Sequence, residues 1–225
     1  MAIYIETYQG LERDVRKHLI TICQNDPGLS FELGHSHPSV PGSQFVLVRY
    51  QPTNTSVGAQ IVGEASDSSR LVMDTNVGAM VPINGDVLIF PREYDDQYPD
   101  GEGGFLTVYQ QPGFTFHEPD DVIGGWQTHI YCDPSPIWQG APGANYVTKD
   151  SSGACLPAPH LVILFHELVH AARVLQLPVE EAAKVTHELN ALIVENMYRL
   201  SVGLPARGDL FVSEKEIAKA AGVCP

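Results

Sequence analysis

The stretch "LFHELVHAARVL", residues 164 to 175, places two histidines four positions apart in an apolar run, with a glutamate directly after the first. The surrounding apolar residues recur at helical spacing and predict one helix from about Pro159 to Gln176. Residues i and i+4 are neighbours on one helix face, so His166 and His170 can offer their imidazoles to a single ion. Polar residues buried on an apolar helix need partners, and a metal ion supplies them. The stretch therefore predicts a metal site on a helix.

The chemistry of this spacing favours a catalytic Zn2+. Zinc in catalytic sites takes three protein ligands and a water molecule. A carboxylate beside that water can accept its proton, and Glu167 is placed to act as this general base. A structural zinc has no need of a general base, so the glutamate favours an enzyme.

The third ligand has to come from outside this helix. The sequence predicts a turn at "LQLP" and a second helix from about Val179 to Val202, ended by Gly203 and Pro205. In an antiparallel helical hairpin, the first three turns of the second helix can face the two histidines, whereas Glu195 lies further away. The residues alone leave three candidate carboxylates open: Glu180, Glu181 and Glu188.

The chain before residue 155 has a different pattern. "GLERDVRKHLITICQNDPG" predicts an amphipathic helix with Leu11, Val15, Leu19 and Ile22 on one face. Short β-rich runs separated by turn residues follow: "QFVLVRYQP", "AQIVGEA", "RLVMDT", "DVLIFPRE", "FLTVYQQP" and "WQTHIYC". We therefore predict an α+β fold, in which a twisted, mostly antiparallel sheet in the N-terminal part packs on a helical C-terminal part. A last helix is predicted over "SEKEIAKAAG".

Length and charge bound the function. The 225 residues suit a single domain over residues 1–225, which we expect to be monomeric. The net charge of −14 argues against nucleic acid or an anionic membrane as a partner and favours a basic protein or peptide. The N-terminal "MAIYIETYQGLERD" lacks a basic region followed by an apolar core, so we expect no Sec-type signal.

Three other features favour simpler interpretations. His35 and His37 in "GHSHP" suit a solvated loop better than a metal clip. "EYDDQYPDGEGG" reads as a solvated acidic loop that helps attract basic substrates, because its spacing does not fit a calcium loop. Cys155 precedes His166 as an upstream cysteine does in peptide deformylases, but the other deformylase motifs are missing.

Four motifs resemble one known family. "HELVHA", "EEAAKV", "VENMYR" and "GLPAR" resemble the bacterial effector zinc metallopeptidases typified by NleD, which effectors of the HopH kind and, more distantly, clostridial neurotoxin light chains also resemble. The resemblance covers roughly residues 160 to 211. It implies a zincin-like fold of the gluzincin type and an effector delivered into the cytoplasm of a host cell.

The resemblance also implies roles for individual residues. It points to Glu180 as the third zinc ligand, to Glu195 as the residue that orients a zinc histidine, and to Arg207 as a stabiliser of the transition state. The tyrosine usually found three positions after that arginine is Leu210 here. Arg207 then acts alone, or with a tyrosine from elsewhere such as Tyr198.

These observations lead to one expected function and one alternative. The expected function is a zinc endopeptidase that cleaves a host protein, bound in an extended conformation along an edge strand of the sheet. The alternative is a non-catalytic binding module that keeps the metal as a structural staple.

Overall fold

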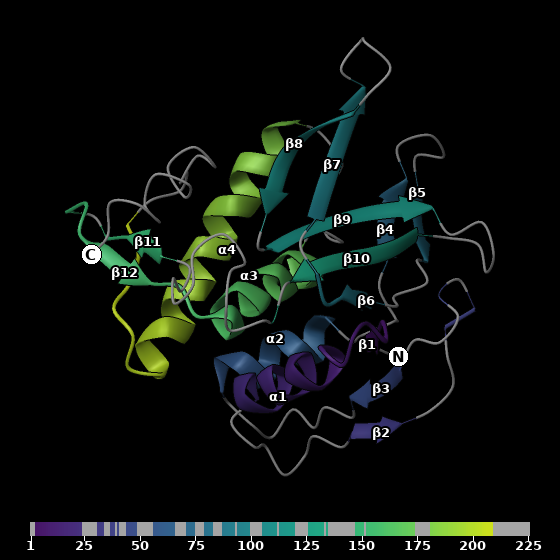
Figure 1. Cartoon of the computed structure of the whole chain (residues 1–225), viewed down its shortest axis with the longest axis horizontal. Helices are drawn as coiled ribbons and strands as arrows, with labels where there is room; N and C mark the ends of the chain where they lie inside the picture. Colours follow the sequence, from purple (N-terminus) through teal and green to yellow (C-terminus); the bar gives the residue numbers. More distant parts are fainter. Residues whose placement is uncertain are drawn as a thin grey trace.

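A mixed α/β fold is seen in the computed structural model of the chain (Figure 1). The structure describes residues 3–23, 31–33, 37–38, 40, 44–48, 56–65, 71–74, 79–82, 87–92, 94–99, 105–111, 113–119, 126–132, 134, 147–150, 152–173 and 181–208. The elements in chain order are β1 (Ile3–Ile5), α1 (Glu12–Ile22), β2 (Phe31–Leu33), β3 (Gln44–Val48), α2 (Val57–Ala65), β4 (Leu71–Asp74), β5 (Ala79–Pro82), β6 (Val87–Phe90), β7 (Tyr94–Pro99), β8 (Phe105–Gln111), β9 (Gly113–Pro119), β10 (Trp126–Cys132), β11 (Val147–Lys149), β12 (Cys155–Pro157), α3 (His160–Arg173) and α4 (Glu181–Ser201).

The main sheet is mixed, and its centre is parallel. Its strand order is β2-β3-β1-β6-β10-β9. β6 lies between β1 and β10 and pairs in parallel with both, while the pairs further out are antiparallel. All four residues of β6 are buried, as is typical of a central parallel strand covered on both faces. The expectation of a mostly antiparallel sheet was therefore wrong for the centre, where long connections join the parallel strands. α1 and α2 lie in the chain between β1 and β6, and β7, β8 and β9 lie between β6 and β10.

The remaining described strands form three separate hairpin-like pairs: β4 with β5, β7 with β8, and β11 with β12. β7 contains the first part of the expected acidic loop. Tyr94–Pro99 pairs antiparallel with β8, so this part is a strand and the expectation of a loop was wrong there. Residues 100–104 lie outside the described residues.

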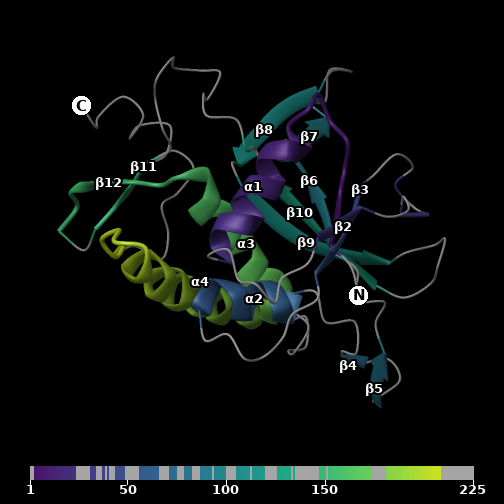
Figure 2. The same cartoon turned by 90° about the horizontal axis from the view of Figure 1, so that it is seen from below.

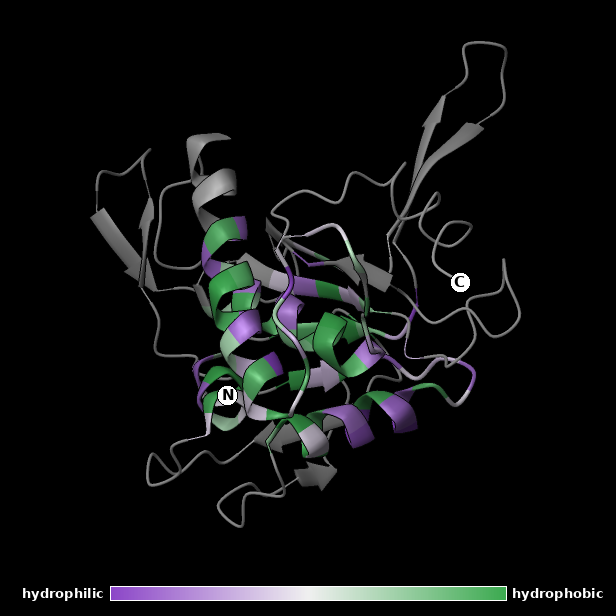
Figure 3. Ribbon diagram, turned by 90° about the vertical axis from the view of Figure 1, so that its left-hand side faces the viewer, coloured by the Kyte–Doolittle hydropathy of each residue, from purple (hydrophilic) through white to green (hydrophobic). Residues whose placement is uncertain are grey.

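Helix α3 occupies the centre of the molecule. It contacts α1, α2 and α4 and also the strands β9 and β10 (Figure 1; Figure 2). Its apolar side chains are fully or almost fully buried with those of α1 and the parallel strands: Ile3, Ile5, Val15, Leu19, Ile22, Ile89, Ile130, Val162, Phe165, Leu168 and Val169. Hydrophobic segments lie mainly where the ribbons pack together, and hydrophilic ones lie mainly toward the outside (Figure 3). The motif helix is thus a core helix, which holds its polar residues in fixed positions.

The amphipathic N-terminal helix is confirmed as α1. Val15, Leu19 and Ile22 are completely buried, in agreement with the predicted apolar face. The helix ends at Ile22, and the "NDPG" sequence expected to end it lies outside the described residues.

The segment "AQIVGEA" was expected to be a strand, and this was wrong, because it belongs to helix α2. The hydroxyl of Ser56 accepts a hydrogen bond from the backbone N–H of Ala59 at 3.2 Å, which caps the helix start. A side chain at Gly58 would overlap the backbone carbonyl of Ile22, so the glycine lets α1 and α2 approach closely. This tertiary contact, together with the cap, outweighs the β propensity of Ile61 and Val62.

The two C-terminal helices are confirmed over the described residues as α3 and α4, and the predicted helix ends at Gln176 and Val179 lie outside those residues. α4 ends at Ser201 and is followed by Gly203, whose φ of +80° is in the left-handed region. The backbone N–H of Leu204 donates to the carbonyl of Arg199, and that of Gly203 donates to the carbonyl of Leu200. This pattern is a Schellman motif, which explains why a glycine stands there.

The helix predicted over "SEKEIAKAAG" lies outside the described residues. None of the helices in the described part of the chain has the length and apolarity that a membrane span requires.

Candidate metal centre

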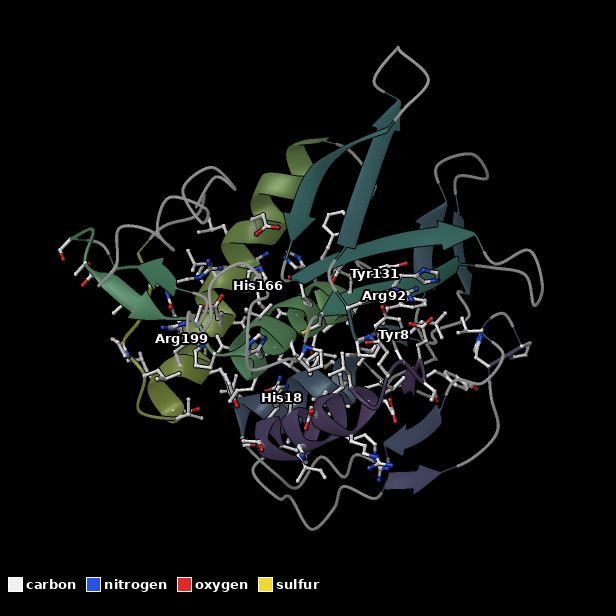
Figure 4. All side chains as sticks on the ribbon, in the orientation of Figure 1. Tyr8, His18, Arg92, Tyr131, His166 and Arg199 are labelled. Carbon is white, nitrogen blue, oxygen red and sulfur yellow. The ribbon has the colours of Figure 1, made fainter. Side chains whose placement is uncertain are left out.

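The two histidines of the motif face α4 from the same side of α3. Their Nε2 atoms are 3.0 Å apart, and the rings meet edge to face with centroids at 4.7 Å. Figure 4 shows His166 on the side of α3 that faces α4. The i, i+4 spacing on a packed helix thus produces the juxtaposition expected from the sequence.

Glu188 on α4 completes a cluster with both histidines. Its Oε1 lies 3.2 Å from Nε2 of His170, and its Oε2 lies 3.5 Å from Nε2 of His166. The edge of a zinc tetrahedron with bonds of about 2.05 Å measures about 3.3 Å, so these separations suit three ligands of one ion. Two imidazoles and a carboxylate are also a donor set that binds first-row transition metals. Among the described residues, His166, His170 and Glu188 are the group that could hold a metal ion.

The other two candidates for the third ligand have no described side chain. Glu180 lies outside the described residues, so its assignment from the family resemblance stays a prediction. Glu181 begins α4, but its side chain is not among those described. Glu188 was the most distant of the three open candidates along the chain, and it is the one that the structure brings to both histidines.

Glu195 contacts the opposite side of the His166 ring. Its Oε2 lies 2.9 Å from Nδ1 of His166. If Nε2 binds a metal, Nδ1 carries the proton and donates to this carboxylate, which fixes the orientation of the ring. The structure therefore places Glu195 where the resemblance implied a residue that orients a zinc histidine.

Arg207 also lies on the Nδ1 side of His166. One of its terminal nitrogens is 2.8 Å from Oε2 of Glu195 and 3.3 Å from Nδ1 of His166. The guanidinium thus pairs with Glu195 behind the histidine, away from the cluster formed at Nε2. Its predicted action on the transition state stays a prediction.

Two residues that the sequence did not single out hold Arg207 against α4. The side-chain amide of Asn196 donates to the Arg207 carbonyl and accepts from its backbone N–H, both at 2.9 Å. The Nε of Arg199 donates to the carbonyl of Pro205 at 2.7 Å, and its terminal nitrogen lies 3.5 Å from Oε1 of Glu195. Arg199 is completely buried, and a buried positive charge needs a negative partner, which Glu195 provides. Both residues belong to the "VENMYR" motif, and membership of this motif is the sequence feature by which they could have been predicted.

Glu167 contacts the edge strand β9 of the sheet. Its side chain is almost completely buried, and its Oε2 accepts a hydrogen bond of 2.7 Å from the hydroxyl of Thr115. This partner is 52 residues away in the sequence, and no sequence pattern indicated it. The sheet therefore holds the carboxylate in place, near enough to His166 for its negative charge to raise the pKa of that imidazole.

The electrostatics of the site tie the histidines to the carboxylates. Burial alone would lower the pKa of the His166 imidazole, but hydrogen bonds to Glu188 and Glu195 raise it to about 9. Burial would raise the pKa of Glu188, but its hydrogen bonds to the two histidines hold that pKa well below its usual range. Burial is likewise outweighed at Glu195, whose pKa is lowered by His166 and the neighbouring arginines. In the absence of a metal, the protonated and therefore positively charged ring of His166 lies between the two carboxylates and attracts both.

We expect a metal ion bound by the cluster to displace that proton. Near pH 7 binding should release about one proton from His166, because its pKa is raised to about 9 and metal ions bind neutral imidazole. Above a pH of about 9 the share of the release that comes from His166 should fall toward zero, and ionisation of the metal-bound water accounts for any release that persists there. The pKa is raised on folding, so without metal this group stabilises the fold fully below about pH 6.5, and the contribution is lost as the pH rises through about 9. Titration calorimetry in buffers of different ionisation enthalpy measures the release, and a value near zero at pH 7 would contradict the assignment.

Three further expectations meet the structure outside the cluster. Tyr198 is completely buried with its ring stacked on Phe165 at 4.2 Å, so it packs in the core, and its suggested action on an oxyanion stays a prediction. His37 is only 1% exposed and contacts the ring of Tyr4, so the expectation of a solvated histidine was wrong, while His35 lies outside the described residues. Cys155 begins strand β12.

Comparisons of the chain with protein-family models, with curated proteins and with solved structures found no match. The resemblance of the four motifs to effector metallopeptidases therefore stays a prediction. The geometry of the cluster is the independent support for a function.

Proposed function

We propose that the protein is a zinc-dependent endopeptidase that cleaves a protein substrate. The observation that carries this proposal is the cluster of three ligand atoms at separations of 3.0, 3.2 and 3.5 Å. A buried carboxylate, Glu167, stands on the same helix directly after the first of these ligands. A zinc ion bound there supplies a Lewis acid for a peptide carbonyl and lowers the pKa of water.

The protein residues divide the remaining work. His166, His170 and Glu188 hold the ion, and Glu195 keeps the His166 ring in one orientation through Nδ1. Glu167 accepts the proton of the attacking water at a carboxylate oxygen. The resemblance assigns Arg207 to the developing oxyanion. Its guanidinium pairs with Glu195 at 2.8 Å on the Nδ1 side of His166, so its charge acts on the cluster across that ring.

Strand β9 is the proposed docking edge for the substrate. It is an end strand of the main sheet, runs beside α3 and contacts Glu167 through Thr115 (Figure 1). No strand in the described part of the chain pairs with its outer edge. An extended substrate can add there as a further strand through backbone hydrogen bonds, which places a peptide bond next to the proposed base.

The resemblance of the motifs extends the proposal to the setting. We propose an effector that is delivered into the cytoplasm of a host cell, acts there as a monomer, and cleaves a host protein. The alternative of a binding module with a structural metal requires no base, so the buried Glu167 beside the cluster favours the peptidase.

A cleavage profile tests the function and its specificity together. We expect the zinc-loaded protein to cut a proteome-derived peptide library and to prefer basic residues near the cut, because the net charge of −14 attracts cations. The preference should weaken as salt shortens the screening length, to about 8 Å at physiological ionic strength. Mass spectrometry of the new termini at low and high salt measures both effects.

Cleavage without enrichment of basic residues near the cut and without salt sensitivity would agree with a peptidase but contradict the electrostatic attraction of basic substrates. The absence of cleavage in every library, from a protein that binds zinc, would favour the binding module.

A further inference from the structure

We propose that Thr115 is a positioning residue for Glu167 and that Gly113 provides the space for the carboxylate. The effect on catalysis that we propose rests on the proposed peptidase function, whereas the contact between Thr115 and Glu167 does not. Both residues belong to β9, the edge strand that we propose as the substrate-docking edge.

The hydroxyl of Thr115 contacts two oxygens of Glu167. It lies 2.7 Å from the carboxylate oxygen Oε2 and 3.2 Å from the backbone carbonyl oxygen of the same residue. A hydroxyl has one proton to donate, and a charged carboxylate at the shorter distance is the stronger acceptor. The bond therefore fixes the rotation of the Glu167 side chain relative to its own helix turn.

Gly113 bounds the other carboxylate oxygen. A Cβ atom at this position would lie 2.7 Å from Oε1 of Glu167 and 2.6 Å from Cγ2 of Ile163. Both distances are too short for real contacts, so a larger residue would displace the Glu167 carboxylate and the tip of the Ile163 side chain. Gly113 and Thr115 are two positions apart and face the same side of the strand. One strand face therefore shapes the surroundings of both oxygens.

The two β9 residues that surround the Glu167 carboxylate pair with buried residues of the neighbouring strand. Gly113 pairs with Cys132, and Thr115 pairs with Ile130, in the neighbouring strand β10. Cys132 and Ile130 are completely buried. A base held by a strand that is anchored in the core keeps one geometry, as efficient proton transfer requires.

A double-mutant cycle on thermal stability tests the contact without using activity. In the full chain at matched metal content, Thr115→Val should lower Tm by about 3 to 6 °C, because it removes a charge-assisted hydrogen bond. In the Glu167→Ala background the same change should lower Tm by less than half as much, and Thr115→Ser in the wild-type background should recover most of the loss. Equal shifts of Tm in both backgrounds would overturn the contact.

The kinetic arm tests positioning. Thr115→Val should lower kcat about tenfold with KM unchanged, because the base is displaced and substrate contacts remain. Thr115→Ser should restore most of kcat, and Gly113→Ala should lower it as Thr115→Val does. A Thr115→Val enzyme with wild-type kcat, or one changed only in KM, would overturn the positioning role. If the wild-type chain cleaves nothing, the proposed function fails and the catalytic part fails with it, while the Tm cycle still decides the contact.

Discussion

Glu167→Ala is expected to abolish peptide cleavage and to leave the fold and the bound zinc in place. Glu167 is not one of the three clustered ligands, so His166, His170 and Glu188 can still hold the ion. What is lost is the acceptor for the proton of the attacking water, and with it the position of that water. General-base catalysis contributes up to about ten-thousandfold, so the barrier should rise by roughly 4 to 6 kcal/mol.

Zinc content, thermal stability and cleavage should be measured on the same preparations. Glu64→Ala offers a matched control, because this glutamate is on α2 and hydrogen-bonds Gln60. The control should keep wild-type cleavage. Wild-type activity in Glu167→Ala would refute the peptidase mechanism, and loss of zinc would identify Glu167 as a ligand.

Glu188→Ala is expected to lose zinc. The carboxylate of Glu188 lies within 3.5 Å of both histidine Nε2 atoms, so its removal leaves two ligands of the cluster. Residues that merely support a ligand cost ten- to a hundredfold in metal affinity when mutated, so a direct ligand should cost more than about a hundredfold. Competition with a chromophoric chelator measures the affinity, and cleavage should be lost in parallel.

Glu180→Ala is the decisive companion variant. If Glu188 is the third ligand, Glu180→Ala should retain zinc affinity within a few-fold of the wild type. The opposite pair of results, with zinc lost in Glu180→Ala and kept in Glu188→Ala, would assign the ligand as the motif resemblance implies. His170→Ala should lose zinc in either case and serves as the positive control.

Elements with a strong local signal were predicted well. α1, α3 and α4 were expected from apolar spacing, and the glycine at residue 203 marked the end of α4. The joint placement of His166 and His170 also followed, because one helical turn brings them together wherever the helix packs.

Elements whose conformation depends on distant contacts were predicted poorly. α2 was taken for a strand because Ile61 and Val62 have high β propensity, whereas its helix is supported by the close approach of Gly58 to α1. The parallel centre of the sheet was missed for a related reason. Strand runs show where strands lie in the chain, but they do not show which neighbour each one pairs with.

The same distinction between local signals and distant contacts holds for the candidate site. By itself the sequence determined the helix, the common face of the two histidines and the adjacent Glu167, since these depend only on helical periodicity within five residues. The tertiary structure alone decided that Glu188 faces both histidines, that Glu195 and Arg207 meet behind His166, and that Thr115 holds Glu167. These contacts join residues from separate elements. Each depends on how α4 and β9 pack against α3, and spacing along a chain carries no information about that packing.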